Sequence, residues 1–190
     1  QRYCGLRVAL WFKSTATVLW PSTLIMAGPV VQCSFNPRVF ERLWKVWGPF
    51  EADMFASAAT VQADPAGARL PYWSLFADGA SVGVDALTAD WGSMGRVFAF
   101  PHVPLVGKVL QLAKAQGARV LLIVPEWHSQ LWWPMLQEQA VMGPIDLARL
   151  HVPHLDGPLF VQGRTGMTPH PLGKKGPKKA KRWMAVWLQP

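Results

Sequence analysis

Three short apolar runs in the middle of the chain, each ending in small, acidic or proline residues, most constrain its fold. They occupy residues 50–57, 96–102 and 119–127. Such runs are typical of parallel strands that are buried on both faces. Parallel strands deliver the loops that follow them to one edge of a sheet, and α/β folds bind ligands at that edge. The sequence therefore predicts an α/β fold with a candidate site after these runs.

Helical patterns lie before and between the runs. Residues 104–116 place apolar side chains at helical spacing, and Gly117 follows as a stop signal. Strand, helix and strand in this order predict one βαβ unit. Upstream, Asn36 is expected to cap a helix that starts at Pro37 and ends before Gly48. Weaker patterns predict two further short strands, at residues 145–150 and 159–161.

A longer ordered series of motifs runs through the same region. Its members are Asn36-Pro37-x-Val39-Phe40, Trp47-Gly48-Pro49-Phe50-x-x-Asp53-x-Phe55-Ala56-Ser57, Val84-Asp85-Ala86-Leu87, Asp90-Trp91, Phe98-Ala99-Phe100-Pro101, Leu105-Val106-x-x-Val109-Leu110, Val124-Pro125-x-Trp127 and Trp132-Trp133-Pro134. This series, over residues 34–136, resembles a region of retroelement polyproteins. In tyrosine-recombinase retrotransposons of the DIRS type, that region follows the reverse transcriptase and RNase H regions.

The same series is more distantly similar to phage-type DNA N6-adenine methyltransferases. This resemblance implies a Rossmann-like, methyltransferase-type sheet with helices on both faces, and a site for S-adenosylmethionine. In that family the acidic residue after the first strand belongs to the cofactor pocket. Asp53 matches this residue, and Ala56 and Ser57 stand in the turn that follows it.

The catalytic loop of those enzymes reads Asn/Asp-Pro-Pro-Tyr, and its acceptors hold the target amine while the aromatic ring stacks on the flipped base. The corresponding residues here are Ala99, Phe100, Pro101 and His102, so that one proline is lost and the tyrosine position falls on His102 or Val103. The apolar ring of Phe100 cannot polarise an amine. The sequence therefore predicts no catalytic residue and at most a vestigial cofactor pocket. Its members are Asp53, Ala56, Ser57, Phe100 and Pro101.

Charge is segregated along the chain, which carries a net charge of +8. All eleven acidic residues lie between Glu41 and Asp156. The charged residues of segments 1–40 and 157–190 are all basic. A basic run, residues 173–182, contains glycines and a proline that disfavour a stable helix, so an extended polycation is expected. Its cations are Lys174, Lys175, Lys178, Lys179, Lys181 and Arg182.

The basic run favours contact with the phosphates of RNA or DNA, since neutralising phosphates releases counterions whatever the base sequence. A solvated tail that aids solubility and a nuclear localisation signal are the alternatives. The chain also has 11 tryptophans. Most are expected to pack in the core or in grooves, but Trp132 and Trp133 are the best candidates for stacking on bases.

The amino-terminal region is apolar and free of acidic residues. Residues 16–31 are interrupted by Pro21, Gly28 and Pro29, so no membrane span is predicted. A transit segment, a fragment start and a true start at Met26 are the alternatives.

No metal site is predicted from the sequence. Two cysteines, Cys4 and Cys33, are too few for a zinc site, and Pro153 disfavours the helix that would align the rings of His151 and His154.

These patterns predict three regions: an extension over residues 1–33, a methyltransferase-like domain over 34–163 and a basic tail over 164–190. Two functions follow. The first is a non-catalytic nucleic-acid-binding module of a larger ribonucleoprotein assembly, such as an organellar ribosome, with protein partners and no cofactor. The second is an adenine methyltransferase using S-adenosylmethionine, or a piece of a reverse transcriptase polyprotein. The predicted location is intracellular, in a mitochondrion or another organelle, with the nucleus as the alternative.

Overall fold

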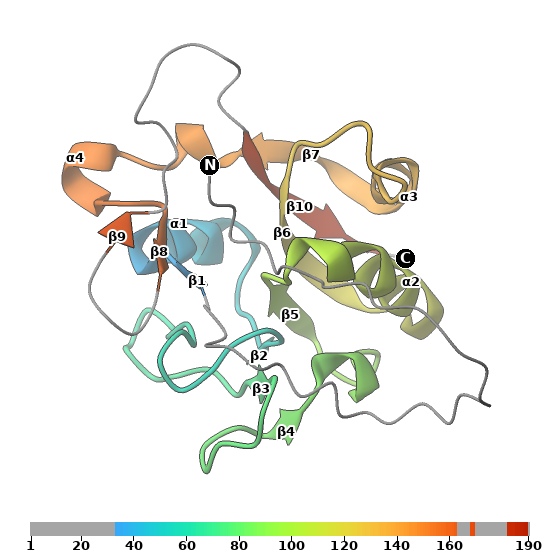
Figure 1. Cartoon of the computed structure of the whole chain (residues 1–190), viewed down its shortest axis with the longest axis horizontal. Helices are drawn as coiled ribbons and strands as arrows, with labels where there is room; N and C mark the ends of the chain where they lie inside the picture. Colours follow the sequence, from blue (N-terminus) through green and yellow to red (C-terminus); the bar gives the residue numbers. More distant parts are fainter. Residues whose placement is uncertain (1–32, 163–167, 170–181, 190) are drawn as a thin grey trace, which may run out of the picture.

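A central five-stranded sheet organises the computed structural model, which describes residues 33–162, 168–169 and 182–189 (Figure 1). The strands stand in the order β2-β5-β6-β10-β7. Their bounds are β2 (Ala52–Asp53), β5 (Arg96–Ala99), β6 (Arg119–Pro125), β10 (Trp183–Leu188) and β7 (Ala140–Asp146). β2, β5 and β6 run parallel, and β10 runs antiparallel to both of its neighbours. The predicted α/β class is therefore confirmed as a mixed α/β fold.

A short parallel ladder extends the sheet beyond β2. It consists of β3 (Trp73–Ser74) and β4 (Gly83–Val84). An isolated parallel bridge between Asp53 and Tyr72 connects the ladder to β2, and the Asp53 amide donates to the Pro71 carbonyl at 2.9 Å. The strands therefore follow one another in space as β4-β3-β2-β5-β6-β10-β7.

The first helix, α1 (Pro37–Trp47), begins where the sequence predicts. The Asn36 side chain accepts hydrogen bonds from the amides of Arg38 and Val39, which satisfies two donors of the first turn. The buried side chains of α1 are Val39, Phe40, Leu43 and Trp47. The Gly48 amide closes the helix by donating to the Trp44 carbonyl.

The predicted βαβ unit is confirmed as β5, α2 (Val106–Gln116) and β6. A 3₁₀ turn, η2 (Val103–Leu105), precedes the helix. Gly117 ends it in the left-handed conformation, with φ of 66°, and donates to the Ala113 carbonyl. A residue with a Cβ would be strained at this φ, which explains the glycine.

Each face of the sheet carries its own core. Side chains of the strands alternate between the two faces, so that Val97, Leu122 and Val186 contribute to one core and Phe98, Leu121 and Ala185 to the other. Helices α2 and α3 (Trp133–Gln139) cover the first face, and α1 covers the second (Figure 1). We call these the α2-side core and the α1-side core.

A second small sheet packs beside α1. It contains β1 (Cys33–Phe35), β8 (Phe160–Gln162) and β9 (Thr168–Pro169), in the order β1-β8-β9. β8 is the short strand expected at residues 159–161. The strand expected at 145–150 lies earlier, as β7, because Asp146 caps the 3₁₀ turn η3 (Leu147–Arg149) by accepting from the Ala148 amide at 3.0 Å. A further 3₁₀ turn, η1 (Ala86–Thr88), precedes β5.

The last strand, β10, differs most from the sequence expectation. It lies inside the range expected to be a tail, yet it occupies an interior position between β6 and β7. Met184 pairs with Val124 on one side and with Asp146 on the other. The cations expected at residues 174–181 fall outside the described residues, and in sequence they connect β9 to β10. The basic run therefore joins two strands.

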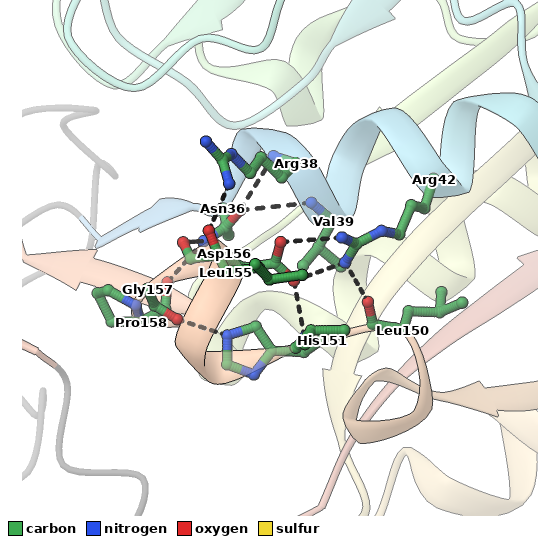
Figure 2. Close-up of polar contacts among 11 residues, drawn as sticks. Asn36, Arg38, Val39, Arg42, Leu150, His151, Leu155, Asp156, Gly157 and Pro158 are labelled. Carbon is green, nitrogen blue, oxygen red and sulfur yellow. Dashed lines mark hydrogen bonds and ion pairs between the residues drawn. The ribbon is translucent and has the colours of Figure 1, made fainter.

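A polar clasp connects α1 to the short helix α4 (Pro153–Asp156), as Figure 2 shows. Arg42 forms an ion pair with Asp156, whose side chain is fully buried, and also donates to the Leu150 carbonyl. The Asn36 amide group donates to the carbonyls of Asp156 and Pro158, both at 2.8 Å. Since Asn36 also caps α1, one side chain fixes both the helix start and the segment that crosses it.

Among the helices of the described ranges, none has the length and apolar composition that a membrane span requires.

Candidate functional site

The carboxyl ends of β2, β5 and β6 meet at one edge of the sheet and bring three loops together. The loops begin at Asp53, Phe100 and Glu126. Between β2 and β5 the order of strands reverses, because the strands that follow β2 in sequence, β3 and β4, lie on the opposite side of it from β5. Ligands of open α/β sheets bind at such a switch point. Residues of the first two loops therefore form the candidate site that the sequence predicts.

Asp53 is a buried carboxylate that holds its own loop. The residue is 2% exposed, and its side-chain oxygens accept from the amides of Phe55 at 3.4 Å and Gln62 at 3.2 Å. Burial raises the pKa of Asp53 to about 7, although the two backbone donors act in the opposite direction. Both oxygens are directed at the chain itself, so Asp53 serves the loop over residues 53–62.

Ala56 and Ser57 lie in the turn after Asp53, as expected. Ala56 is buried, and its amide donates to the Trp73 carbonyl at 3.1 Å, which fastens the turn to β3. The Ser57 amide donates to the Thr60 hydroxyl oxygen at 3.0 Å, and the two hydroxyls are 3.2 Å apart. The polar groups of this turn are thus engaged in local contacts.

Phe100 contributes its ring to a group of aromatic side chains at the end of β5. It stacks on Phe160 with ring centroids 5.1 Å apart and planes inclined by 14°. Phe35 and Trp183 lie at centroid distances of 5.9 Å each. This aromatic cluster, consisting of Phe35, Phe100, Phe160 and Trp183, brings together β1, β5, β8 and β10. Pro101 is buried beside it and His102 is exposed.

A charged network lies at the ends of β6, β7 and β10. Arg182 approaches Glu126 at 3.5 Å and Asp146 at 3.0 Å. Glu126 also lies 3.2 Å from Nε2 of His128. Arg182 is therefore held by two carboxylates at the point where the basic run re-enters the sheet. The five lysines expected to bind nucleic acid, Lys174, Lys175, Lys178, Lys179 and Lys181, lie outside the described residues.

The two candidate tryptophans differ in their surroundings. Trp132 is 7% exposed and belongs to the α2-side core, whereas Trp133 is only partly buried. The imidazole of His128 lies over Trp133 with a centroid distance of 4.4 Å and an inclination of 37°. A buried ring offers no face to a base, so Trp133 is the better placed of the two for stacking.

Sequence reasoning missed the charged network and the aromatic cluster. Both depend on β10, which carries Arg182 and Trp183 to the end of β6, where Trp183 pairs with Pro125. The available signal was the six-residue apolar run of Trp183–Leu188, which has the length of a buried strand. The lysines before it favoured a tail instead.

Surface hollows lie away from the switch point. One lies between α2 and α3 and is lined in part by Gln111, Leu131 and Met135. The other lies between α2 and η1, beside Leu87 and Leu112. Neither of these two hollows includes Asp53, Ser57 or Pro101. Within the described ranges, no group of three or more His, Cys, Asp or Glu side chains could hold a metal ion.

The acceptors of Asp53 bind their own loop, the polar groups of Ser57 contact Thr60, and the ring of Phe100 stacks on Phe160 at the end of β5. Comparison with models of protein families, with curated proteins and with solved structures gave no match.

Proposed function

We propose that the chain is a non-catalytic nucleic-acid-binding module, derived from a methyltransferase-like domain of a DIRS-type retroelement. In this proposal it acts within a larger ribonucleoprotein assembly in an organelle, an organellar ribosome being one such assembly, with the nucleus as the alternative location. The basic run contacts phosphates, and protein partners hold the module in place. No cofactor takes part.

The observation that carries the proposal is the packing of Phe100. A methyl-transfer site needs an acceptor for the target amine at this position, and it needs open space beside that acceptor. The ring of Phe100 instead stacks on Phe160 and lies against Phe35 and Trp183. Restoring an acceptor there would place a polar group in an aromatic cluster, so the packing favours a fold that has lost its chemistry.

The order of strands supports a Rossmann-like origin. Numbered by their order in the chain, the strands from β4 to β6 follow one another in space as 3-2-1-4-5, which is the order of the Rossmann fold. The switch point of that fold lies between its first and fourth strands. Here these are β2 and β5, and Asp53 and Phe100 stand at their carboxyl ends.

The connection of the basic run supports contact with nucleic acid at this same edge. Its last cation, Arg182, lies beside Glu126 at the end of β6. Lys181 is bonded directly to Arg182, so it starts within about 4 Å of it. The basic run therefore joins the described fold next to the edge at which α/β folds bind ligands.

Binding of single-stranded RNA and DNA oligonucleotides at a series of salt concentrations tests the proposal. We expect tight binding that weakens steeply with salt, and a variant with Lys174, Lys175, Lys178, Lys179 and Lys181 changed to Ser should lose most of it. The slope of log affinity against log salt should fall by about 0.7 for each phosphate contact removed. A control with Lys45→Ser and Lys108→Ser changes exposed lysines of the domain. Equal slopes for all three proteins would contradict the proposal.

The alternative function is an adenine methyltransferase that uses S-adenosylmethionine, and the position of Asp53 at the switch point favours it. Calorimetric titration of the chain with S-adenosylmethionine, beside an Asp53→Ala variant, separates the two functions. Micromolar binding that the variant loses would support the enzyme. Absence of heat in both proteins, together with the salt-dependent binding above, would support the module.

A further inference from the structure

We infer that His128 and Trp133 form a stacking subsite for one unpaired base of a single-stranded nucleic acid. The inference rests on the proposed function, and it names the place where a base, rather than a phosphate, meets the chain. It concerns described residues alone, at the ends of β6 and β10 and the start of α3.

The two rings lie against each other at an inclination of 37°, and the outer ring is exposed. The imidazole of His128 lies 4.4 Å from the centroid of Trp133. The ring of Trp133 also contacts that of Trp132, at a centroid distance of 6.0 Å, and Trp132 is buried in the α2-side core. The His128 side chain is 66% exposed. Two thirds of the His128 side chain is therefore open to a ligand even though the ring contacts Trp133.

Glu126 holds the imidazole without covering that face. Its Oε1 atom lies 3.2 Å from Nε2 of His128. When the Nε2–H group donates to this oxygen, the hydrogen bond lies in the plane of the ring, so it fixes the orientation and leaves both faces available. The Glu126 side chain is only 24% exposed and is itself approached by Arg182, which limits its movement. The contact with Glu126 and the contact with Trp133 therefore both favour one orientation of the imidazole.

Arg182 supplies hydrogen-bond donors beside the same ring. Its side chain is 57% exposed although it contacts both Glu126 and Asp146. A guanidinium has five N–H donors, so two carboxylates leave donors for a phosphate oxygen. Of the two side chains that contact Glu126, His128 offers its ring to a base and Arg182 offers its remaining donors to the backbone of the strand.

This arrangement selects an unpaired base. A base in a duplex has neighbours on both faces and cannot lie on a protein ring, whereas single strands present free faces to aromatic side chains. Stacking of this kind tolerates any base, since every base has a π-face. The ligand is therefore a single strand of RNA or DNA without a required sequence.

The affinity of the chain for two oligomers of about twelve nucleotides tests the inference. One is oligo(U), and the other is a wholly abasic oligomer of the same charge. We expect His128→Ala to weaken oligo(U) binding about tenfold and to leave binding of the abasic oligomer unchanged. His128→Phe, which keeps a ring but loses the contact with Glu126, should retain most of the affinity for oligo(U). His154→Ala, a change of an exposed histidine on α4, is the matched control.

The outcomes separate the subsite from the proposed function. If the unaltered chain binds oligo(U) and His128→Ala binds it equally well, the subsite is refuted while the module stands. An equal loss for both oligomers would also refute the subsite, because it would indicate an electrostatic contact. If the unaltered chain binds neither oligomer, the proposed function fails and the subsite fails with it.

Discussion

Asp53 has an unusual environment, because it is a buried acid with which no cation of the described residues pairs. Within the same residues, the amides of Phe55 and Gln62 donate to its oxygens. Buried carboxylates of this kind favour the neutral form, which explains a pKa near 7. The unfolded chain has no such burial, and there the group ionises near 3.8. Folding therefore opposes ionisation of Asp53 through the range between these two values.

This difference predicts that the protein becomes less stable as pH rises. The folded state holds a proton that the unfolded state has already released, so the free energy of unfolding falls between about pH 4 and pH 7. From pH 5 to pH 8 the contribution of Asp53 falls by about 2–3 kcal/mol. Asp53→Asn should remove this part of the pH dependence. Urea unfolding of both proteins at pH 5 and pH 8 measures it.

Asp64→Asn is the control, since Asp64 is also a loop acid but lies nearer the surface. It should leave the difference between the two pH values as in the unaltered protein. The expectation would be contradicted if the free energy of unfolding fell equally between pH 5 and pH 8 in Asp53→Asn and in the unaltered protein. Ionisation of the Asp53 carboxyl would then not destabilise the fold.

At the scale of elements, an ion pair and several hydrogen bonds join α1 to α4 in the clasp (Figure 2). Arg42, one third exposed, reaches the fully buried carboxylate of Asp156, which also accepts from the Val152 amide at 2.7 Å. The hydrogen bond from Arg42, followed by that from Val152, lowers the pKa of Asp156 to about 2. The clasp therefore depends on an ionised acid.

The clasp should weaken in acid. Because the pKa of Asp156 is lower in the folded state than in the unfolded state, its ionised carboxylate stabilises the fold fully above about pH 4. This stabilisation is lost as the pH falls toward 2. Arg42→Met should raise the midpoint of acid unfolding by about one pH unit, because it leaves the buried carboxylate without its cation. Circular dichroism between pH 6 and pH 2 measures the midpoint.

Lys45→Met provides the comparison on the same helix. It breaks the pair of Lys45 with Glu41, in which both side chains are at least half exposed, and such pairs contribute little. We expect its acid midpoint to match that of the unaltered chain. A shift as large as that of Arg42→Met would mean that the general charge of α1, and not the clasp, sets the acid limit.

Elements whose signals are local could be predicted from the sequence. The cap at Asn36 and the stop at Gly117 are each written in a few adjacent residues, and both are confirmed. The position of Asp53 after a buried run was predictable for the same reason. The contacts of Arg182 and Trp183 were not, since their partners Glu126 and Phe100 lie more than fifty residues away in the chain.

For the whole molecule, the sheet depends on its last strand. Met184, Ala185, Val186, Trp187 and Leu188 are all buried in β10. Burying a large apolar side chain contributes about 1.5–3 kcal/mol, and a domain has only about 5–15 kcal/mol in total. Deletion of residues 183–190 should therefore abolish cooperative unfolding. Thermal denaturation followed by near-ultraviolet circular dichroism checks this.

Removal of Gln189 and Pro190 alone is the matched truncation. Gln189 is exposed and follows β10, so this shorter deletion should keep a melting temperature close to that of the full chain. A cooperative transition in the longer deletion, at the temperature of the full chain, would show that β6 and β7 do not need β10 between them.

The interior place of β10 also affects how the protein is made. β6 and β7 leave the ribosome well before Trp183–Leu188, yet they are neighbours only through that strand. Until it emerges, β6 presents a row of unpaired amides and carbonyls to other chains, and such edges promote aggregation. The sheet of the nascent chain therefore stays incomplete until β10 has been synthesised. A chaperone that shields apolar strands would have its greatest effect during this stage of synthesis.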